Sequence, residues 1–300
     1  MEKKTIKTNS SQAWLLAARP VTLTCAAAPI LVALTNAWHD LRGAGEPFHW
    51  IPAILCLLFA FMMQIDANFI NDYFDFVKGV DREDRLGPKR ACAEGWITPS
   101  AMRTGIALTT LIACLIGMPL IWYGGTEMIA IGIACVLFSF LYTTTLARRG
   151  LGDVLVLLFF GIVPVGITYY IQTQVMTTAT IWLALSIGLA TDTLLIVNNY
   201  RDRDTDVISG KRTLVILIGA RNTEWLYLAL GIIACLCCIP LYLEGKRMAL
   251  VFSLVYLIPH VLTWRKMVSI NQGKQLNEVL GATARNIFIL GILISIGLLF

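Results

Sequence analysis

Charged residues are scarce in this sequence. Only 14% of its 300 residues are Asp, Glu, Lys or Arg, against about 25% in soluble globular domains, and 57% are hydrophobic. The mean hydropathy of +0.71 points the same way. This composition excludes a soluble globular enzyme, a disordered protein and a nucleic-acid-binding module. The net charge of +5 is explained more simply by basic loops on one side of a membrane than by nucleic-acid binding.

Three other features are missing. The eight cysteines show no spacing typical of a metal site or a disulfide framework, and we interpret them as small core residues. The first apolar stretch follows Lys3, Lys4 and Lys7 without a convincing small-residue cleavage site, so we expect a retained helix rather than a signal peptide. No polar stretch looks like an extramembrane domain. We therefore expect one integral membrane domain over residues 1–300.

Long apolar runs dominate what is present, and a bilayer-spanning helix needs roughly 20 such residues. Their basic flanks are one-sided, since 21 of the 24 Lys and Arg residues belong to the N-terminal segment and every second loop. This asymmetry predicts a cytoplasmic N-terminus and a C-terminus outside. We predict an all-α, multi-pass protein with nine transmembrane helices, at about 14–37, 51–74, 102–122, 127–146, 153–172, 179–199, 224–243, 247–265 and 281–300.

The acidic residues are concentrated where the second and sixth apolar runs end, on the predicted cytoplasmic side. Eleven of the 19 fall in two windows, residues 66–94 and 192–206. In each window an Asn and two Asp recur at helical spacing, which places them on one face of a helix. These residues are Asn68, Asp72 and Asp75 in the first window, and Asn198, Asp202 and Asp206 in the second, with Asn199 able to share that face.

A glycine follows each acidic helix end. After Gly79 the chain can turn and bring Asp81 back toward Asp75. Gly210 allows a similar turn just before Lys211. Both windows therefore predict a helix end followed by a returning loop.

Carboxylates that share one face at a membrane interface repel each other unless a cation lies among them. Mg²⁺ suits such a place, because it is held by one or two carboxylates while substrate phosphates complete its shell. Basic side chains in the same loops can take the remaining phosphate oxygens. The pattern favours a metal-bridged diphosphate over ordinary solvated loops because it occurs twice on one side. The basic residues are Lys78, Arg85, Lys89 and Arg90 in one loop, and Arg201, Lys211 and Arg212 in the other.

The two windows resemble the metal motifs of the UbiA superfamily of intramembrane prenyltransferases. The first reads N-F-I-N-D-Y-F-D-F-V-K-G-V-D from Asn68 to Asp81, and R-L-G-P-K-R follows. The second reads N-N-Y-R-D-R-D-T-D-V-I-S-G-K-R-T-L from Asn198 to Leu214. Further matches are A-R-P-V-T-L at 18–23 and G-L-G-D at 150–153. The six-residue step from Asp75 to Asp81 is longer than in many members and resembles the 1,4-dihydroxy-2-naphthoate polyprenyltransferase branch.

This resemblance implies nine helices around a central cavity open to the cytoplasmic leaflet of a bacterial plasma membrane. It also implies Mg²⁺-dependent transfer of a polyprenyl group from a polyprenyl diphosphate to 1,4-dihydroxy-2-naphthoate, with loss of pyrophosphate and CO₂. By position, the metal ligands are Asp72, Asp75, Asp81, Asp202 and Asp206, and Arg85, Lys89, Arg90 and Lys211 lie near the diphosphate.

Two residues inside the apolar runs are weaker candidates. Asp192 is an intramembrane carboxylate that lies two to three helical turns before Asp202, and it is a candidate contact for the aromatic acceptor. Tyr142 lines the cavity or packs at the membrane interface. Two other functions remain open, a UbiA-type enzyme acting on 4-hydroxybenzoate and a cation-coupled transporter. Transporters place charge near the bilayer midplane, whereas most acidic residues here gather at one face.

Overall fold

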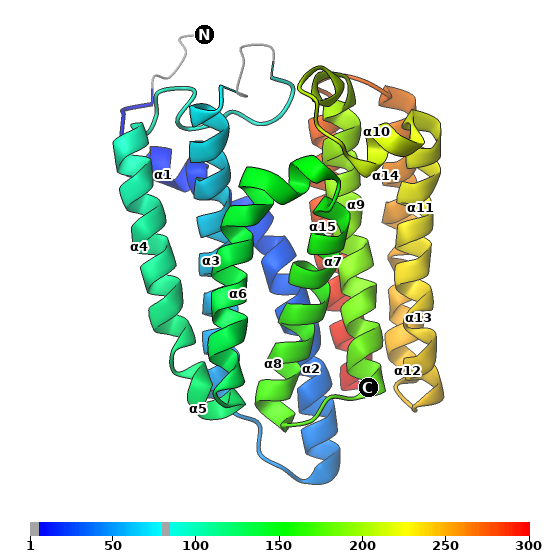
Figure 1. Ribbon diagram of the computed structural model, residues 1–300. Coiled ribbons are helices and arrows are strands. Elements are labelled where there is room, and N and C mark those ends of the chain that lie inside the picture. The colour runs from blue at the N-terminus through cyan, green and yellow to red at the C-terminus, as the bar shows by residue number, and fades with distance from the viewer. Residues whose placement is uncertain (1–5, 80–84) are drawn as a thin grey trace.

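The computed structural model describes residues 6–79 and 85–300. All regular secondary structure in these ranges is helical, and the long helices stand side by side in one bundle (Figure 1). This confirms the predicted all-α fold. The bundle has two ends, one carrying the acidic motifs (top in Figure 1) and the other the connection between α2 and α3 (bottom).

The first half of the chain contributes four of the long helices. A break at η1 (Pro20–Thr22) separates the short α1 from the long α2, and Pro119 lies between α4 and α5. The helices are α1 (Ser11–Ala18), α2 (Leu23–Ala44), α3 (Trp50–Val77), α4 (Pro99–Gly117), α5 (Leu120–Gly124) and α6 (Glu127–Leu141).

The second half begins with irregular helix. Two π-helical turns, η2 (Tyr142–Leu146) and η4 (Leu158–Ile162), and a 3₁₀ turn, η3 (Ala147–Arg149), lie around α7. The α-helices are α7 (Gly152–Leu157), α8 (Val163–Thr173), α9 (Thr178–Ile208), α10 (Leu214–Ile218), α11 (Ala220–Leu236), α12 (Ile239–Leu243), α13 (Arg247–Val255), α14 (Leu257–Ile270) and α15 (Leu276–Leu299).

Nine helical segments in the described ranges are long and apolar enough to cross a membrane, as predicted. The two that carry the acidic motifs run further than the hydropathy indicated, to Val77 and Ile208. Asp and Asn residues at helical spacing extend each helix beyond its apolar part. The motif side chains therefore project from helix ends rather than from loops.

Helix α9 is the centre of the bundle and packs against α2, α7, α11 and α15. Small residues allow the close approach that helix packing in membranes requires. A β-carbon on Gly161 of η4 would lie only 2.8 Å from the Cα of Gly188 in α9. On the outside, α4 and α6 expose aliphatic side chains suited to lipid contact, namely Leu108, Leu111, Leu115, Ile129, Ile133 and Leu137.

A polar cluster ties the opposite end of the bundle together. Lys246 is buried, and its Nζ donates to Asn36 Oδ1 and pairs with Asp40 Oδ1, both at 2.6 Å. Tyr169 Oη donates to the other oxygen of Asp40 at 2.8 Å. These contacts join α2, α8 and the segment before α13.

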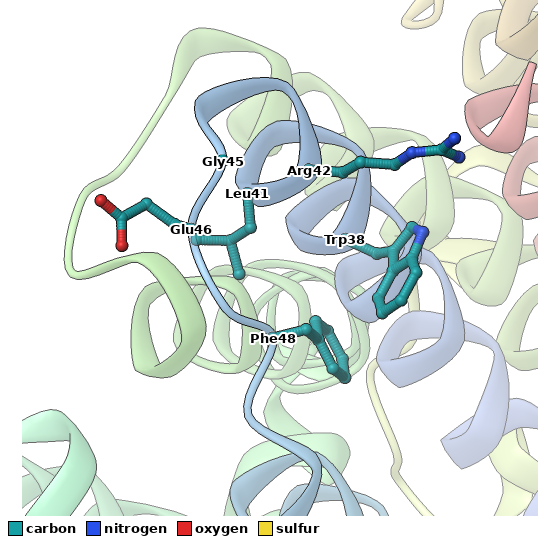
Figure 2. Close-up of a pocket in the computed structure, with 6 residues that line it drawn as sticks. All are labelled: Trp38, Leu41, Arg42, Gly45, Glu46 and Phe48. Carbon is teal, nitrogen blue, oxygen red and sulfur yellow. The ribbon is translucent and has the colours of Figure 1, made fainter.

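A cavity of about 330 Å³ lies at this same end, around the turn after α2 (Figure 2). Aromatic rings and an arginine line it, and the acidic motifs lie at the other end of the bundle. It therefore plays no part in the candidate site. The lining residues are Trp38, Leu41, Arg42, Gly45, Glu46 and Phe48.

Candidate active site

Asp72 and Asp75 lie near the end of α3 and hold the loop that returns toward α4. Asp72 is 1% exposed, and its two oxygens accept hydrogen bonds from the backbone N–H groups of Ala91 and Cys92, each at 2.8 Å. Asp75 lies one turn further, with its Oδ2 2.7 Å from Nη2 of Arg90. The first motif thus fixes residues 90–92 against α3.

Asn68 faces the break between α1 and α2. Its Nδ2 donates to the carbonyl oxygen of Ala18 and to Oγ1 of Thr22, each at 3.0 Å. Between these two acceptors lies Arg19, whose φ of +51° is uncommon for a residue with a side chain. Asn68 therefore connects the first motif to the residues on either side of Arg19, whose backbone has this strained conformation.

Arg19 is a candidate functional residue that the sequence reasoning missed. Its Nη2 atom is buried and has no hydrogen-bond partner among the described residues. The side chain interacts electrostatically with four charged residues of the first motif and its loop, which are Arg90, Asp72, Arg85 and Asp75. A cation within the first apolar run, in the A-R-P sequence, was the available signal.

The second motif is organised by a buried arginine. Arg201 is 1% exposed, and its Nε and Nη2 donate to the two oxygens of Asp202 at 2.8 and 2.6 Å. Its Nη2 also donates to Asn198 Oδ1, and its Nη1 donates to Asn277 Oδ1 on α15, both at 2.9 Å. The prediction that Asn198 and Asp202 share a face is confirmed by their common partner.

The turn after α9 brings a lysine back onto the second motif, as the sequence predicted. Gly210 has a φ of +70°, and Lys211 Nζ then reaches Asp206 Oδ2 at 3.0 Å. Asp206 is 8% exposed, and Asn199 is buried on the same helix.

The two motifs meet through the loop from Arg85 to Cys92. Asn277 Nδ2 donates to the carbonyl oxygen of Leu86 at 2.7 Å, and Asn277 also binds Arg201. A β-carbon on Gly87 would lie 2.9 Å from Nη2 of Arg201 and 3.3 Å from Nη2 of Arg85. The loop thus runs from Asp72 and Asp75 at one end to Arg201 at the other, and it brings residues about 125 positions apart into one site.

The remaining basic candidates differ in exposure. Lys89 is 63% exposed at its side chain and pairs with Glu94. Lys78 Nζ donates to the carbonyl oxygen of Thr144 at 2.9 Å. Burial lowers the pKa of Lys78, Arg148 lowers it further, and Asp75 opposes both. Neither lysine is locked as firmly as Arg90 or Arg201, and Asp81 lies outside the described residues.

Asp192 and Tyr142 belong to a second group, deeper along the helices. Ten residues separate Asp192 from Asp202, which is about 15 Å along a helix axis. Asp192 and Tyr142 both interact electrostatically with Asp153. The structure therefore brings together most of the predicted site residues, and it places these two deeper along the helices than the ion-paired motifs.

The donor set of the site suits a hard cation that shares a diphosphate. Among the described residues no three His, Cys, Asp or Glu side chains form a ready-made metal cage. Mg²⁺ does not require one, since one or two carboxylates with phosphates and waters are its usual protein shell. Asp75, Asp202 and Asp206 retain 23%, 21% and 12% exposure at their side chains and can serve. Asp72 can do so only with lone pairs that its two backbone amides leave free.

Two acidic motifs, each paired with basic side chains, lie at one end of a helical membrane bundle, and this arrangement suits a charged phosphate group with a metal ion. The profile of the UbiA prenyltransferase family matches residues 32–292, and the chain belongs to this family. It is therefore a prenyltransferase, and the transporter alternative is excluded.

The chain is similar to several proteins named 1,4-dihydroxy-2-naphthoate octaprenyltransferase. The Haemophilus influenzae protein is 30% identical over 100% of this chain and 99% of its own length. The Escherichia coli K12 protein is 34% identical over 77% of each chain.

Solved structures share the fold at low sequence identity. A UbiA homolog from Aeropyrum pernix K1, in apo form, aligns with a TM-score of 0.66 at 16% identity, over 90% of this chain and 96% of its own. A UbiA homolog from Archaeoglobus fulgidus bound to GPP and Mg²⁺ aligns with a TM-score of 0.65 at 15% identity, over 94% and 99%. These likenesses confirm the predicted fold class.

Proposed function

We propose that this enzyme transfers a polyprenyl group from a polyprenyl diphosphate to 1,4-dihydroxy-2-naphthoate, with loss of pyrophosphate and CO₂. The observation that carries the diphosphate part is the Arg85–Cys92 loop, which connects the Asp75–Arg90 pair to the Asp202–Arg201 pair. When substrate binds, carboxylates arranged in this way can bind the metal ion instead of the basic side chains, and the basic side chains can then bind the diphosphate.

Different side chains of the site would bind the metal ion and the oxygens of the diphosphate leaving group. Asp75, Asp202 and Asp206 would hold Mg²⁺, with Asp72 and Asp81 as further ligands predicted from the motif. The ion, when bound, neutralises negative charge that develops on the departing diphosphate. Arg90, Arg201 and Lys211 are already oriented by these carboxylates and would take outer phosphate oxygens, as would Lys78, Arg85 and Lys89.

The acceptor assignment rests on sequence relatives and on motif spacing. The relatives named for dihydroxynaphthoate match most or all of the chain. The longer Asp75–Asp81 step and the run from Arg85 to Arg90 resemble those of the same branch. Chemically, dihydroxynaphthoate is the more electron-rich acceptor, and its carboxylate can depart as CO₂ from the carbon that prenylation attacks. 4-Hydroxybenzoate is the alternative acceptor.

We place the enzyme in a bacterial plasma membrane with the site facing the cytoplasm. The support is the basic bias of the loops at the end of the bundle that carries both motifs. This orientation puts the N-terminus inside and the C-terminus outside.

A panel of acceptors tests the proposal. Purified enzyme, one prenyl diphosphate and Mg²⁺ are incubated with dihydroxynaphthoate or with 4-hydroxybenzoate, and prenylated products are separated by chromatography. We expect product from dihydroxynaphthoate and little from 4-hydroxybenzoate. Consumption of 4-hydroxybenzoate alone would overturn the acceptor assignment and leave the family membership intact.

A further inference from the structure

A second group of acidic side chains lies inside the membrane-spanning part, between α7, α9 and η2. Asp192 on α9 is only 6% exposed, and its Oδ1 has no hydrogen-bond partner among the described residues. Asp153, in the first turn of α7, also has a buried Oδ1 with no such partner. The two carboxylates interact electrostatically with each other and with Tyr142, the first residue of η2.

The other buried carboxylates in the described chain have hydrogen-bond or ion-pair partners, unlike Asp192 Oδ1 and Asp153 Oδ1. Asp66 on α3 is fully buried, yet its two oxygens accept hydrogen bonds from Thr109 at 2.5 Å and Thr110 at 3.0 Å. Asp72 is likewise satisfied on both oxygens, and the buried Asp206 pairs through its Oδ2 with Lys211. A buried polar atom without a partner costs free energy comparable to a lost hydrogen bond, and a charged one costs more. The Oδ1 atoms of Asp192 and Asp153 are therefore placed for a donor that the described residues do not supply.

The backbone around this group is irregular on both sides of Asp153. The π-helical turns η2 and η4 precede and follow α7, and such turns are rare and often occur at functional sites. A β-carbon on Gly161 in η4 would lie 2.5 Å from the carbonyl oxygen of Ala184, so η4 is pressed directly onto α9. This contact fixes the segment that carries Asp153 beside the helix that carries Asp192.

The group also adjoins the diphosphate site. Thr143, next to Tyr142, donates to Asn71 Oδ1 at 2.6 Å, and Asn71 directly precedes Asp72. Asp192 and Asn199 are seven residues apart and so lie on the same face of α9, toward the second motif. An aromatic acceptor ring placed next to the first carbon of the prenyl chain would lie between the two acidic motifs and Asp192.

We propose that Asp192, with Asp153 as a positioning residue, binds the acceptor hydroxyl adjacent to the reacting ring carbon and takes its proton. This inference rests on the proposed function, in which a hydroxylated aromatic acid is prenylated. A hydroxyl group is the donor that both unpartnered oxygens lack, and a proton accepted there reduces the repulsion between two neighbouring carboxylates.

The step balances without another reagent. The bond between the prenyl carbon and the diphosphate oxygen breaks, and its electron pair leaves with pyrophosphate. The carboxylate-bearing ring carbon bonds to the prenyl carbon, the adjacent O–H gives its proton to Asp192, and that oxygen becomes a ketone. The product is a β-keto acid, which loses CO₂ and leaves an enolate. The enolate takes the proton back from Asp192, so the hydroquinone forms and the carboxylate is regenerated.

Asp192→Asn tests this role, and Asp66→Asn is the matched control because it removes a charge from another buried intramembrane carboxylate. We expect Asp192→Asn to lower kcat/KM for the acceptor by about 10²-fold or more, the range typical of losing a general base. The KM for prenyl diphosphate should stay within about twofold, and Asp66→Asn should leave both acceptor constants near those of the wild type. Asp153→Asn should show a smaller loss of the same kind.

A competitor distinguishes contact from a structural effect. 4-Hydroxy-2-naphthoate lacks the hydroxyl adjacent to the carboxylate, whereas 1-hydroxy-2-naphthoate retains it. In a direct binding assay, wild type should bind the second competitor more tightly than the first. Asp192→Asn should lose most of that preference, and Asp153→Asn should lose part of it. Unchanged acceptor constants in Asp192→Asn, or an equal rise in the KM for prenyl diphosphate, would overturn the inference. If wild type instead uses only 4-hydroxybenzoate, the acceptor assignment fails, and the same kcat/KM comparison with that phenol still decides the role of Asp192.

Discussion

At the scale of single residues, the four motif aspartates have different surroundings, and these predict different phenotypes. Asp72 accepts hydrogen bonds from two buried backbone amides, and Asp202 balances the buried Arg201. Asp75 pairs with Arg90, and Asp206 pairs with Lys211, whose side chain is 22% exposed. Loss of Asp72 or Asp202 therefore leaves buried donors or a buried charge without a partner, at a cost of about 1–3 kcal/mol or more.

We expect alanine at any of the four positions to lower turnover at least about 10²-fold, since each removes charge that faces the diphosphate. Asp72→Ala and Asp202→Ala should also lower the Tm, and by more than Asp206→Ala does, because Lys211 can turn to solvent. Turnover and thermal denaturation in the same detergent measure the two effects separately. Wild-type turnover in Asp72→Ala at matched protein level would contradict the assignment of the first motif.

Arg19 makes a second prediction at this scale. Its buried Nη2 lies among charges of the first motif and its loop, so we expect it to bind the diphosphate. Arg19→Met should raise the KM for prenyl diphosphate by roughly tenfold, which corresponds to one charge-assisted hydrogen bond. Arg42→Met, at the opposite end of the bundle, should leave this KM unchanged. Equal constants in the two variants would remove Arg19 from the site.

At the scale of elements, the sequence predicted a returning loop with Arg85, Lys89 and Arg90 near the diphosphate, but it did not predict the contacts by which the Arg85–Cys92 loop joins the two motifs. The helical spacing of Asn68, Asp72 and Asp75 was readable because the period of a helix is fixed. The contact of Asp72 with the backbone of residues 91–92 could not be predicted, because every non-proline residue offers the same backbone N–H group. The contact of Gly87 with Arg201 depends on tertiary packing that leaves no mark in the local sequence.

Gly87→Ala tests this loop. The added carbon would lie 2.9 Å from Nη2 of Arg201, so either the loop or the guanidinium must shift and the two motifs separate. We expect turnover to fall at least about tenfold, because displacements of about 1 Å at a site can cost 10²-fold. Gly132→Ala is the control, since nothing lies within 4 Å of its added carbon. Wild-type turnover in Gly87→Ala would show that the loop does not set the geometry of the site.

At the scale of the whole molecule, composition and long apolar runs predicted an all-α membrane bundle, and the nine apolar helices in the described ranges confirm it. The predicted ends of α3 and α9 were too early, because hydropathy falls where the acidic motifs begin. Contacts such as Lys246 with Asp40, which join distant helices, could not be predicted because only packing determines which polar residues meet.

Orientation is the prediction that belongs to this scale. From the basic bias of the loops we predict that the motif end of the bundle faces the cytoplasm. A reporter inserted after Gly87 should therefore lie inside, and one fused after Phe300 should lie outside. Reporters on the same side would mean that one of the nine apolar helices does not cross the membrane.

The central claim is that one site joins diphosphate departure to prenylation of dihydroxynaphthoate. Its most direct test uses acceptor labelled in the carboxyl group, together with a prenyl diphosphate, and follows labelled CO₂, pyrophosphate and lipid product in one reaction. We expect the three to form in equal amounts, to vanish with a chelator and to return with Mg²⁺. Prenylated product that retains the label, or turnover that a chelator does not affect, would contradict the account.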